Sequence, residues 1–376
     1  MQKRPSVFIH IGAPKTGTTY LQAILFKNRE ALRGDGVLYP GDAIRSHFWA
    51  SLDLRDASFM AHVDPNVPGA WRRLVAEARA WPRTSVIDHE TFAEARQAHI
   101  DQALADLDFA DVHVIWTARD IVRQLPAAWQ ESIKNRETAS FAEYLEAVRA
   151  GLTGEQPRRV FWPVQAAPRI LARWSRRLPP ERVHVVTVPP SGADPTLLWR
   201  RFAAVLGIDP TAYDTDVVLE NSSFTAAEAA VLRELNALLA DIEIPWPAYR
   251  ATIKHGLTTT LGKRSGDRIA LPEAAYEWAL EWSHHAVALL RKADYDIVGD
   301  LDELIPSARP AGDDPDTAPA EERALAATRM LAALVELIGT QPSVIVNQLS
   351  DGSPRRVRQA VRRVARGALV ARALRG

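Results

Sequence analysis

The sequence of 376 residues contains no cysteine. It therefore has no disulfide bond, no thiolate ligand for a metal and no cysteine nucleophile. It also lacks an apolar run of the roughly 18 residues that a membrane span requires, so we expect no transmembrane helix. Lys15 and Gly17 interrupt the N-terminal segment before it can form the apolar core of a secretory signal. These absences predict a cytoplasmic protein.

The formal net charge is zero, but the charges are unevenly distributed. From Ser353 to the end there are eight arginines and no acidic residue. Within 354–375 the spacing of Val357, Val361 and Val364 predicts a basic amphipathic helix, which is typical of a segment that lies on an anionic membrane or packs on a partner. We expect it to reach the inner face of a membrane and expect no nucleic-acid partner; a solvated tail is the alternative.

The first 305 residues alternate between strand-like and helix-like runs, which favours a three-layer α/β/α domain of P-loop nucleotide-binding type with a central parallel sheet. Strands are predicted over 7–11, 85–87, 112–117 and 183–188. Helices are predicted over 18–33, 68–80, 92–108, 121–135, 141–150, 170–178, 196–206, 225–241 and 272–293. Proline, glycine and aspartate in 306–320 predict a linker. Residues 321–376 are expected to form a helical, arginine-rich C-terminal extension.

A short loop joins the first predicted strand to the first predicted helix. It contains Gly12 and Gly17, and the helix begins near Thr18. A strand, a glycine-containing turn and an immediate helix direct backbone N–H groups and the positive end of a helix dipole toward one point, where an anion binds. Thr19 stands where a nucleotide-binding P-loop has Ser or Thr, but its lysine is displaced to Lys15. The alternative is an ordinary turn with a surface lysine.

The run Pro14, Lys15, Thr16, Gly17, Thr18, Thr19 resembles the PKxGTT loop of sulfotransferases that use 3′-phosphoadenosine 5′-phosphosulfate (PAPS). The resemblance implies PAPS as co-substrate and no metal ion. It implies that Lys15 contacts the oxygen between phosphate and sulfate, while the backbone of residues 16–19 holds the 5′-phosphate. Sulfuryl transfer leaves negative charge on that oxygen, so a cation there stabilises the transition state more than the ground state.

A second element of the resemblance follows the strand predicted at 112–117. The family binds the 3′-phosphate through an arginine after such a strand and a serine eight residues later; Arg119 matches, but Ala127 replaces the serine. Losing one hydrogen bond to a charged group costs about 1.5–3 kcal/mol. Arg123, one helical turn after Arg119, is expected to compensate. The alternative for Arg119 is a salt bridge at the helix start.

Lys263 and Arg264 are candidates for the basic loop that closes over the 3′-phosphate in the family. A solvated turn is the alternative for this pair.

Transfer to a hydroxyl or amine needs a general base. The segment 85–95 is predicted as a strand running into a helix, which places His89 and Glu90 at the carboxyl edge of the sheet, where ligands bind in open α/β sheets. The family uses either residue type, with Glu90 the first choice here and His89 the second. A glutamate with a pKa of about 4.3 is a weak base, so we expect burial to raise it. Complementing a helix dipole is the alternative for Glu90.

Other aromatic and histidine residues are less specific. His10, inside the first strand, is expected to be a core histidine. Aromatic residues at 47–49, 129 and 161–162 are candidates for an acceptor surface.

The sequence therefore predicts a PAPS-dependent sulfotransferase that acts on a small-molecule, glycan or lipid acceptor. A P-loop small-molecule kinase is one alternative, because Asp88 ends a predicted strand and could coordinate Mg²⁺. A catalytically inactive scaffold with a sulfotransferase-like fold is another, which Ala127 favours.

Overall fold

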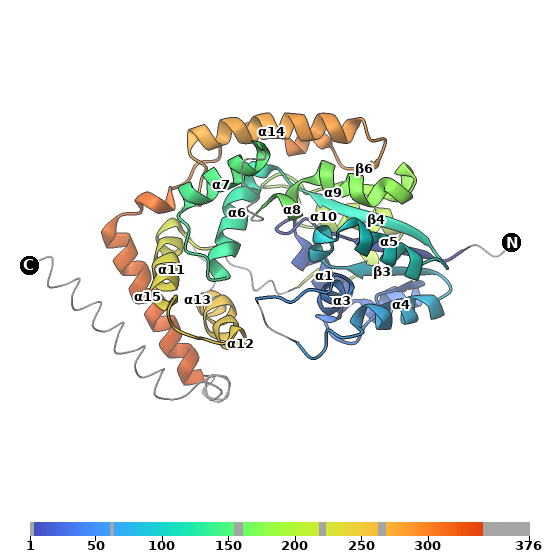
Figure 1. Cartoon of the computed structure of the whole chain (residues 1–376), viewed down its shortest axis with the longest axis horizontal. Helices are drawn as coiled ribbons and strands as arrows, with labels where there is room; N and C mark the ends of the chain where they lie inside the picture. The colour runs from blue at the N-terminus through green and yellow to red at the C-terminus, as the bar shows by residue number, and fades with distance from the viewer. Residues whose placement is uncertain (1–3, 61–63, 154–160, 218–222, 262–267, 341–376) are drawn as a thin grey trace, which may run out of the picture. The chain divides into compact units, whose positions relative to one another are not determined.

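The computed structural model describes residues 4–60, 64–153, 161–217, 223–261 and 268–340 (Figure 1). The chain divides into two compact units. The first comprises Met1–Ala128, Glu146–Leu219 and Pro272–Arg309; the second comprises Trp129–Leu145, Glu220–Leu271 and Pro310–Gly376. The domain predicted over 1–305 is thus divided between the two units.

Among the described residues, the first unit contains one six-stranded sheet in the order β2-β3-β1-β4-β5-β6. Its strands are β1 Ser6–His10, β2 Val37–Leu38, β3 Thr84–Asp88, β4 Asp111–Ala118, β5 Val183–Thr187 and β6 Asp296–Val298. All neighbouring strands are parallel. The chain moves from one side of β1 to the other between β3 and β4, and such a switch point is where ligands bind at the carboxyl ends of the strands.

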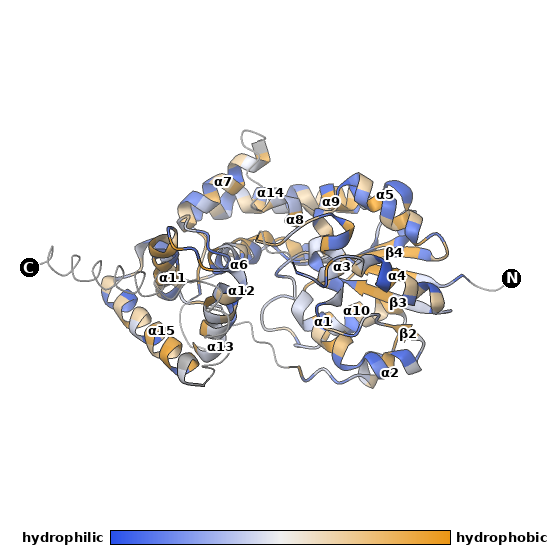
Figure 2. Ribbon diagram, turned by 60° about the horizontal axis from the view of Figure 1, so that its bottom comes forward, coloured by the Kyte–Doolittle hydropathy of each residue, from blue (hydrophilic) through white to orange (hydrophobic). Residues whose placement is uncertain are grey.

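Helices cover both faces of this sheet, which confirms the three-layer α/β/α architecture. Side chains alternate along a strand, so Val7 and Ile9 pack in one apolar cluster and Phe8 in another. The first face is covered by α4 Ala70–Ala80, α5 Gln97–Asp106, α9 Ala167–Trp174 and α14 Glu273–Arg291. The second is covered by α1 Thr18–Lys27, α2 Arg29–Gly34 and α10 Leu197–Leu206. Helices α5 and α9 carry both hydrophilic and hydrophobic residues (Figure 2), as expected for helices packed on a sheet.

Several predicted boundaries are wrong. The helix predicted over 18–33 is two helices, because Asn28 ends α1 and its side-chain amide donates to the Ile24 carbonyl at 2.9 Å. The helix predicted over 92–108 is a 3₁₀ turn, η1 Glu90–Glu94, followed by α5. The prediction missed β2, β6 and helix α3 Ser46–Leu54.

The second unit is helical in the part that the structure describes. It contains α11 Ala226–Leu239, α12 Trp246–Tyr249, the π-helix η5 Arg250–Leu257, α13 Thr258–Leu261, η7 Pro315–Thr317 and α15 Ala320–Thr340. The unit boundaries fall within α6 Ile121–Lys134 and α7 Phe141–Thr153. The remaining short elements, all in the first unit, are α8 Trp162–Gln165, η2 Ser175–Arg177, η3 Pro180–Arg182, η4 Pro210–Ala212 and η6 Leu301–Leu304.

The segment predicted as a linker, 306–320, contains the short turn η7 and the first residue of α15, and from Pro310 it belongs to the second unit. The two carboxylate oxygens of Asp316 accept the backbone N–H groups of Phe141 at 3.0 Å and Ala142 at 2.8 Å, at the start of α7. The predicted basic helix at 354–375 lies outside the described residues. No helix within the described ranges is long and apolar enough to cross a membrane.

Candidate active site

The predicted loop lies at the carboxyl end of β1, next to the switch point of the sheet. Gly17 adopts a left-handed conformation with φ of 88° and stands at the N-cap of α1 without a side-chain capping bond. The first turn of α1 contains no acidic residue. The first N–H groups of a helix have no partner within the helix, so the loop and the helix start together present positive potential suited to an anion.

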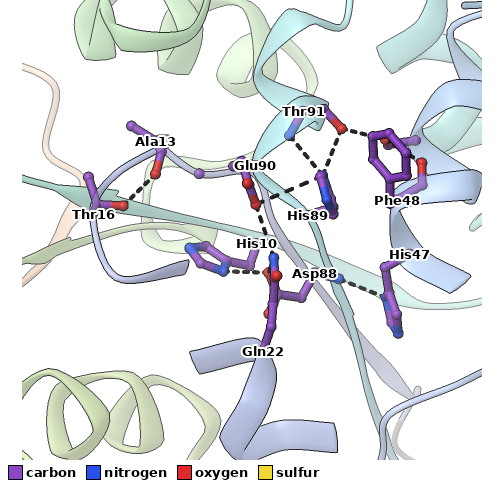
Figure 3. A network of polar contacts seen from close by, with 12 residues as sticks. His10, Ala13, Thr16, Gln22, His47, Phe48, Asp88, His89, Glu90 and Thr91 are labelled. Atoms are coloured by element: carbon purple, nitrogen blue, oxygen red, sulfur yellow. Dashed lines mark hydrogen bonds and ion pairs between the residues drawn. The ribbon is translucent and has the colours of Figure 1, made fainter. Parts of the chain in front are cut away.

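The first half of the loop is fixed to β4. The Gly12 carbonyl accepts the backbone N–H of Thr117 at 2.6 Å and the Thr117 hydroxyl at 3.1 Å. The Ala13 carbonyl accepts the Thr16 hydroxyl at 2.5 Å (Figure 3). Two successive carbonyls are thereby drawn toward the protein interior.

The second half of the loop is fixed from α6, α8 and the end of β4. The Pro14 carbonyl accepts the side-chain amides of Gln124 at 2.8 Å and Gln165 at 2.9 Å. The Lys15 carbonyl accepts a guanidinium N–H of Arg119 at 3.1 Å. In a trans peptide the N–H points opposite to the carbonyl, so the N–H groups of Lys15 and Thr16 are directed away from these donors. This orientation is the one that an anion-binding loop requires.

Gly12 also brings the loop against the candidate base. Its φ is 110°, and a Cβ placed on it would lie 3.1 Å from Cα of Glu90. Only glycine permits both the left-handed conformation and this close approach. The sequence pattern identified Gly12 as a loop boundary, whereas its contact with Glu90 depends on the pairing of β1 with β3.

Glu90 lies where the prediction placed it, after β3 (Figure 3). Its carboxylate accepts the Gln22 side-chain amide at 3.0 Å. Burial alone would raise the pKa of Glu90, but His89, the Glu90 backbone N–H, Gln22 and Lys15 together hold it below its usual value. The expected rise in the pKa of Glu90 is therefore wrong. The lowered pKa favours the ionised carboxylate at neutral pH.

His89 is engaged differently. Its Nδ1 accepts the Thr91 N–H at 3.2 Å, lies 2.8 Å from the Thr91 hydroxyl and is 3.9 Å from Oε2 of Glu90. The Nδ1 lone pair is thus engaged by the Thr91 N–H within the protein and is not available to a proton of the acceptor. The geometry therefore favours Glu90 over His89 as the base. The ring of Phe48, one of the predicted acceptor-surface residues, lies 5.0 Å from the ring of His89.

The two predicted arginines have different surroundings. The structure brings Arg119 to the loop, as described above. Arg123 instead contacts the Asp120 carboxylate through Nε and donates to the Pro189 carbonyl at 3.1 Å. Its predicted compensation for Ala127 stays a prediction. Lys263 and Arg264 lie outside the described residues.

A cavity of about 50 Å³ lies beside the loop on the side of β4. Arg119, Gln124 and Gln165 line it together with Phe161 and Trp282. Its volume suits water rather than a nucleotide. Among the other aromatic candidates, Trp129 and Trp162 belong to the core, with exposed fractions of 0% and 7%.

Sequence reasoning missed the glutamines that hold the loop and Glu90. Gln124 lies on the buried side of the amphipathic helix α6 and is 2% exposed. A glutamine on an apolar helix face, close after the arginine that the sequence predicts to bind phosphate, is the signal that could have identified it. Within the described ranges no three His, Cys, Asp or Glu side chains gather so as to hold a metal ion.

No protein-family model matches the chain, and no curated protein matches it. Two solved structures are similar to it. The sulfotransferase from Alicyclobacillus acidocaldarius is 21% identical over 67% of this chain and 96% of that chain, with a TM-score of 0.40. The sulfotransferase domain from the curacin biosynthetic pathway is 17% identical over 65% of this chain and 94% of that chain, with a TM-score of 0.32. At these TM-scores neither likeness carries an argument about activity, which rests on the site itself. Both are sulfotransferases, the family that the loop at residues 14–19 resembles.

Proposed function

We propose that the protein is a PAPS-dependent sulfotransferase that transfers a sulfuryl group to a hydroxyl or amine of a small-molecule, glycan or lipid acceptor. The observation that carries this proposal is the loop, whose carbonyls accept hydrogen bonds from the fold behind it, while the charge of Lys15 helps to lower the pKa of Glu90. A loop of this polarity binds an anion, and the neighbouring carboxylate supplies a base.

Each site residue has a specific part in this proposal. The N–H groups of the loop and of the first turn of α1 would hold the 5′-phosphate. The Lys15 ammonium would neutralise the charge that develops on the oxygen leaving the sulfur. Arg119 would hold the loop through the Lys15 carbonyl and contribute its positive charge to binding of the 3′-phosphate. Arg123, Lys263 and Arg264 are proposed to complete the 3′-phosphate site.

Glu90 would receive the proton of the acceptor. Its low pKa keeps it in the basic form at neutral pH, and Gln22 fixes its orientation. As the acceptor oxygen bonds to sulfur, its proton passes to Glu90, and the bond from sulfur to the phosphate oxygen breaks next to Lys15. The donor supplies the sulfuryl group; the protein supplies orientation, a cation and a base.

The kinase alternative has less support. A kinase would use Asp88 to hold Mg²⁺, but the Asp88 side chain is fully buried and its Oδ1 contacts Nδ1 of His10 at 2.8 Å. Because the Asp88 carboxylate is buried against His10, it is poorly placed to hold Mg²⁺.

Calorimetry with 3′-phosphoadenosine 5′-phosphate, the nucleotide product, tests the proposal. We expect binding by the native chain and at least about a tenfold loss of affinity, or about 1.4 kcal/mol, in Lys15→Ala and in Arg119→Ala. Lys27→Ala is the matched control, because this lysine lies at the other end of α1 and pairs with Asp214 at 2.6 Å.

Two outcomes would contradict the proposal. Absence of binding by the native chain would favour the inactive scaffold. Transfer of phosphate from ATP that stops in a chelator would favour the kinase, whereas sulfuryl transfer should persist there.

A further inference from the structure

A set of buried polar side chains crosses the sheet directly below the loop. His10 on β1, Asp88 on β3, Thr117 on β4 and Thr16 in the loop are all 0% exposed. The His10 ring lies 5.2 Å from that of Phe202 on α10, so the set faces the layer that contains α10. Burying polar groups in an apolar layer costs free energy unless they are hydrogen-bonded, so their contacts indicate what they stabilise.

The contacts form a continuous path from β3 to β4. Nδ1 of His10 lies 2.8 Å from Oδ1 of Asp88, and Nε2 of His10 lies 3.1 Å from the Thr117 hydroxyl (Figure 3 shows the His10–Asp88 contact). The register of the sheet makes this possible, because His10 and Asp88 are directly opposite each other on β1 and β3.

The path then reaches the loop. The Thr117 hydroxyl donates to the Gly12 carbonyl at 3.1 Å and lies 2.5 Å from the Thr16 hydroxyl, which donates to the Ala13 carbonyl at 2.5 Å. A hydroxyl has a single hydrogen. The Thr117 and Thr16 hydroxyls therefore share two hydrogens among their contacts with His10, with each other and with the Gly12 and Ala13 carbonyls.

The Asp88 carboxylate only accepts, so Nδ1 of His10 carries the hydrogen of that contact. The same Oδ1 accepts the Gln22 side-chain amide at 3.4 Å, whereas Oδ2 is buried and has no hydrogen-bond partner among the described residues. The carboxylate is thus held through Oδ1, on the side that faces His10.

We propose that His10 and Asp88 are positioning residues for the loop. Their contact fixes the His10 ring against the Thr117 hydroxyl, so the Thr117 and Thr16 hydroxyls stay against the Gly12 and Ala13 carbonyls and the loop keeps its conformation. The inference rests on the proposed function for the identity of the anion. The pair touches no substrate and acts through Thr117 and Thr16.

Asp88→Asn tests this inference. Asparagine keeps the shape but offers an uncharged acceptor, so its bond to Nδ1 of His10 is weaker and the ring is held less firmly against Thr117. We expect amide hydrogen exchange in the segment 12–19 to accelerate by about tenfold. We also expect the affinity for 3′-phosphoadenosine 5′-phosphate to fall by about tenfold.

The matched control is Asp296→Asn. This carboxylate belongs to a second His–Asp pair in the same sheet, with Nδ1 of His184 2.6 Å from its Oδ2; the other ring nitrogen of His184 lies 2.9 Å from His113 rather than from a loop residue. We expect no change in exchange over 12–19 and none in nucleotide affinity. A merely structural effect of losing a carboxylate from the sheet would instead appear in both variants.

Thr117→Val decides the question if Asp88→Asn fails to fold. It removes the hydroxyl that links His10 to the loop while leaving the contact between His10 and Asp88, and we expect the same faster exchange over 12–19. Unchanged loop exchange in the folded variants would overturn the proposal. Failure of the native chain to bind the nucleotide would contradict the proposed function alone, since hydrogen exchange needs no ligand.

Discussion

At the level of a single residue, the low pKa of Glu90 has two opposite effects on its proposed role as a base. A base with a low pKa accepts a proton with less driving force, but it is always in its basic form at neutral pH. Lys15 contributes to lowering the pKa of Glu90, and in the proposed reaction the same ammonium stabilises the leaving oxygen. As negative charge develops on that oxygen, Lys15 is increasingly paired with it, so the carboxylate becomes more basic when the proton arrives.

Glu90→Gln is predicted to lower kcat by about a hundredfold or more, which is the usual contribution of general base catalysis. The amide keeps the contact with Gln22 but cannot accept a proton. Nucleotide affinity should change little, because in the proposed reaction Glu90 accepts the proton of the acceptor and does not bind the phosphates. Steady-state kinetics and calorimetry measure the two effects separately.

Glu94→Gln is the control for this prediction, because Glu94 pairs with Arg55 at 2.9 Å and has a side chain that is 46% exposed. Equal loss of kcat in the two variants would refute the assignment of Glu90 as the base.

His47 predicts a pH dependence of stability. Burial is the main reason that its pKa falls to about 4. Its Nδ1 accepts the Asp88 N–H at 3.0 Å and its Nε2 donates to the Pro40 carbonyl at 2.8 Å, an arrangement that only the neutral ring can make. Between about pH 6.5 and 4 the unfolded chain binds a proton that the folded chain does not. The unfolding free energy is therefore greatest above pH 6.5 and falls as the pH decreases.

The expected loss from this one histidine is at most about 3 kcal/mol, from about 1.4 kcal/mol per pH unit. Urea unfolding at several pH values measures it. His47→Gln should be less stable at pH 7 and should lose less stability on acidification than the native chain. His284→Gln, at an exposed position on α14, should follow the native curve. Parallel curves for His47→Gln and the native chain would show that His47 is not the group responsible.

At the level of helices and strands, the sequence predicted the elements that can be recognised from the pattern of apolar residues within the element itself. The strands β1, β3, β4 and β5 are short and apolar, so their periodicity alone located them within one or two residues. β2 has only two residues, too few for a pattern. The break after α1 depends on Asn28, whose side chain also donates to the Asp214 carbonyl at 2.9 Å, a contact 186 residues away.

The residues of the candidate site also differ in whether the sequence alone could predict them. The loop 14–19, Arg119 and Glu90 could be predicted because each follows directly from a strand. The bonds of Gln124 and Gln165 to Pro14 could not, because they join distant segments. The direction of the pKa shift of Glu90 also depends on neighbours that only the fold assembles.

Gly12→Ala tests how closely the loop must approach η1. The substitution carries the cost of a left-handed conformation, about 1–2 kcal/mol, and its Cβ would also meet the backbone of Glu90 at 3.1–3.2 Å. We expect lower stability together with a loss of nucleotide affinity, because either the loop or Glu90 must shift. Denaturant unfolding and calorimetry measure the two effects.

Gly192→Ala is the control that separates the cost of a positive φ from the cost of a steric contact. Gly192 also has a positive φ, of 89°, but a Cβ there would meet nothing within 4 Å. It should lose a similar conformational free energy and keep its nucleotide affinity. If Gly12→Ala behaved in the same way as Gly192→Ala, the close approach of the loop to Glu90 would not matter for binding.

At the level of the whole molecule, the loop, Glu90 and Arg119 belong to one of the two units, since all lie in Met1–Ala128. The second unit has its own internal contacts, such as Lys254 with Glu131 at 2.6 Å and the Asp316 cap of α7. Of the proposed site residues, Lys263 and Arg264 belong to this second unit.

The eight arginines after Ser353 predict that the C-terminal tail binds anionic membranes. Each basic residue near an anionic membrane surface contributes about 1 kcal/mol, and the attraction is screened by salt. We expect the full chain to co-sediment with anionic liposomes at low salt, and to be released at high salt or from neutral liposomes. A chain ending at residue 352 should remain in the supernatant while binding 3′-phosphoadenosine 5′-phosphate as tightly as the full chain. Equal pelleting of both forms would contradict a membrane role for the tail, and a weaker nucleotide affinity in the shortened form would connect the tail to the site instead.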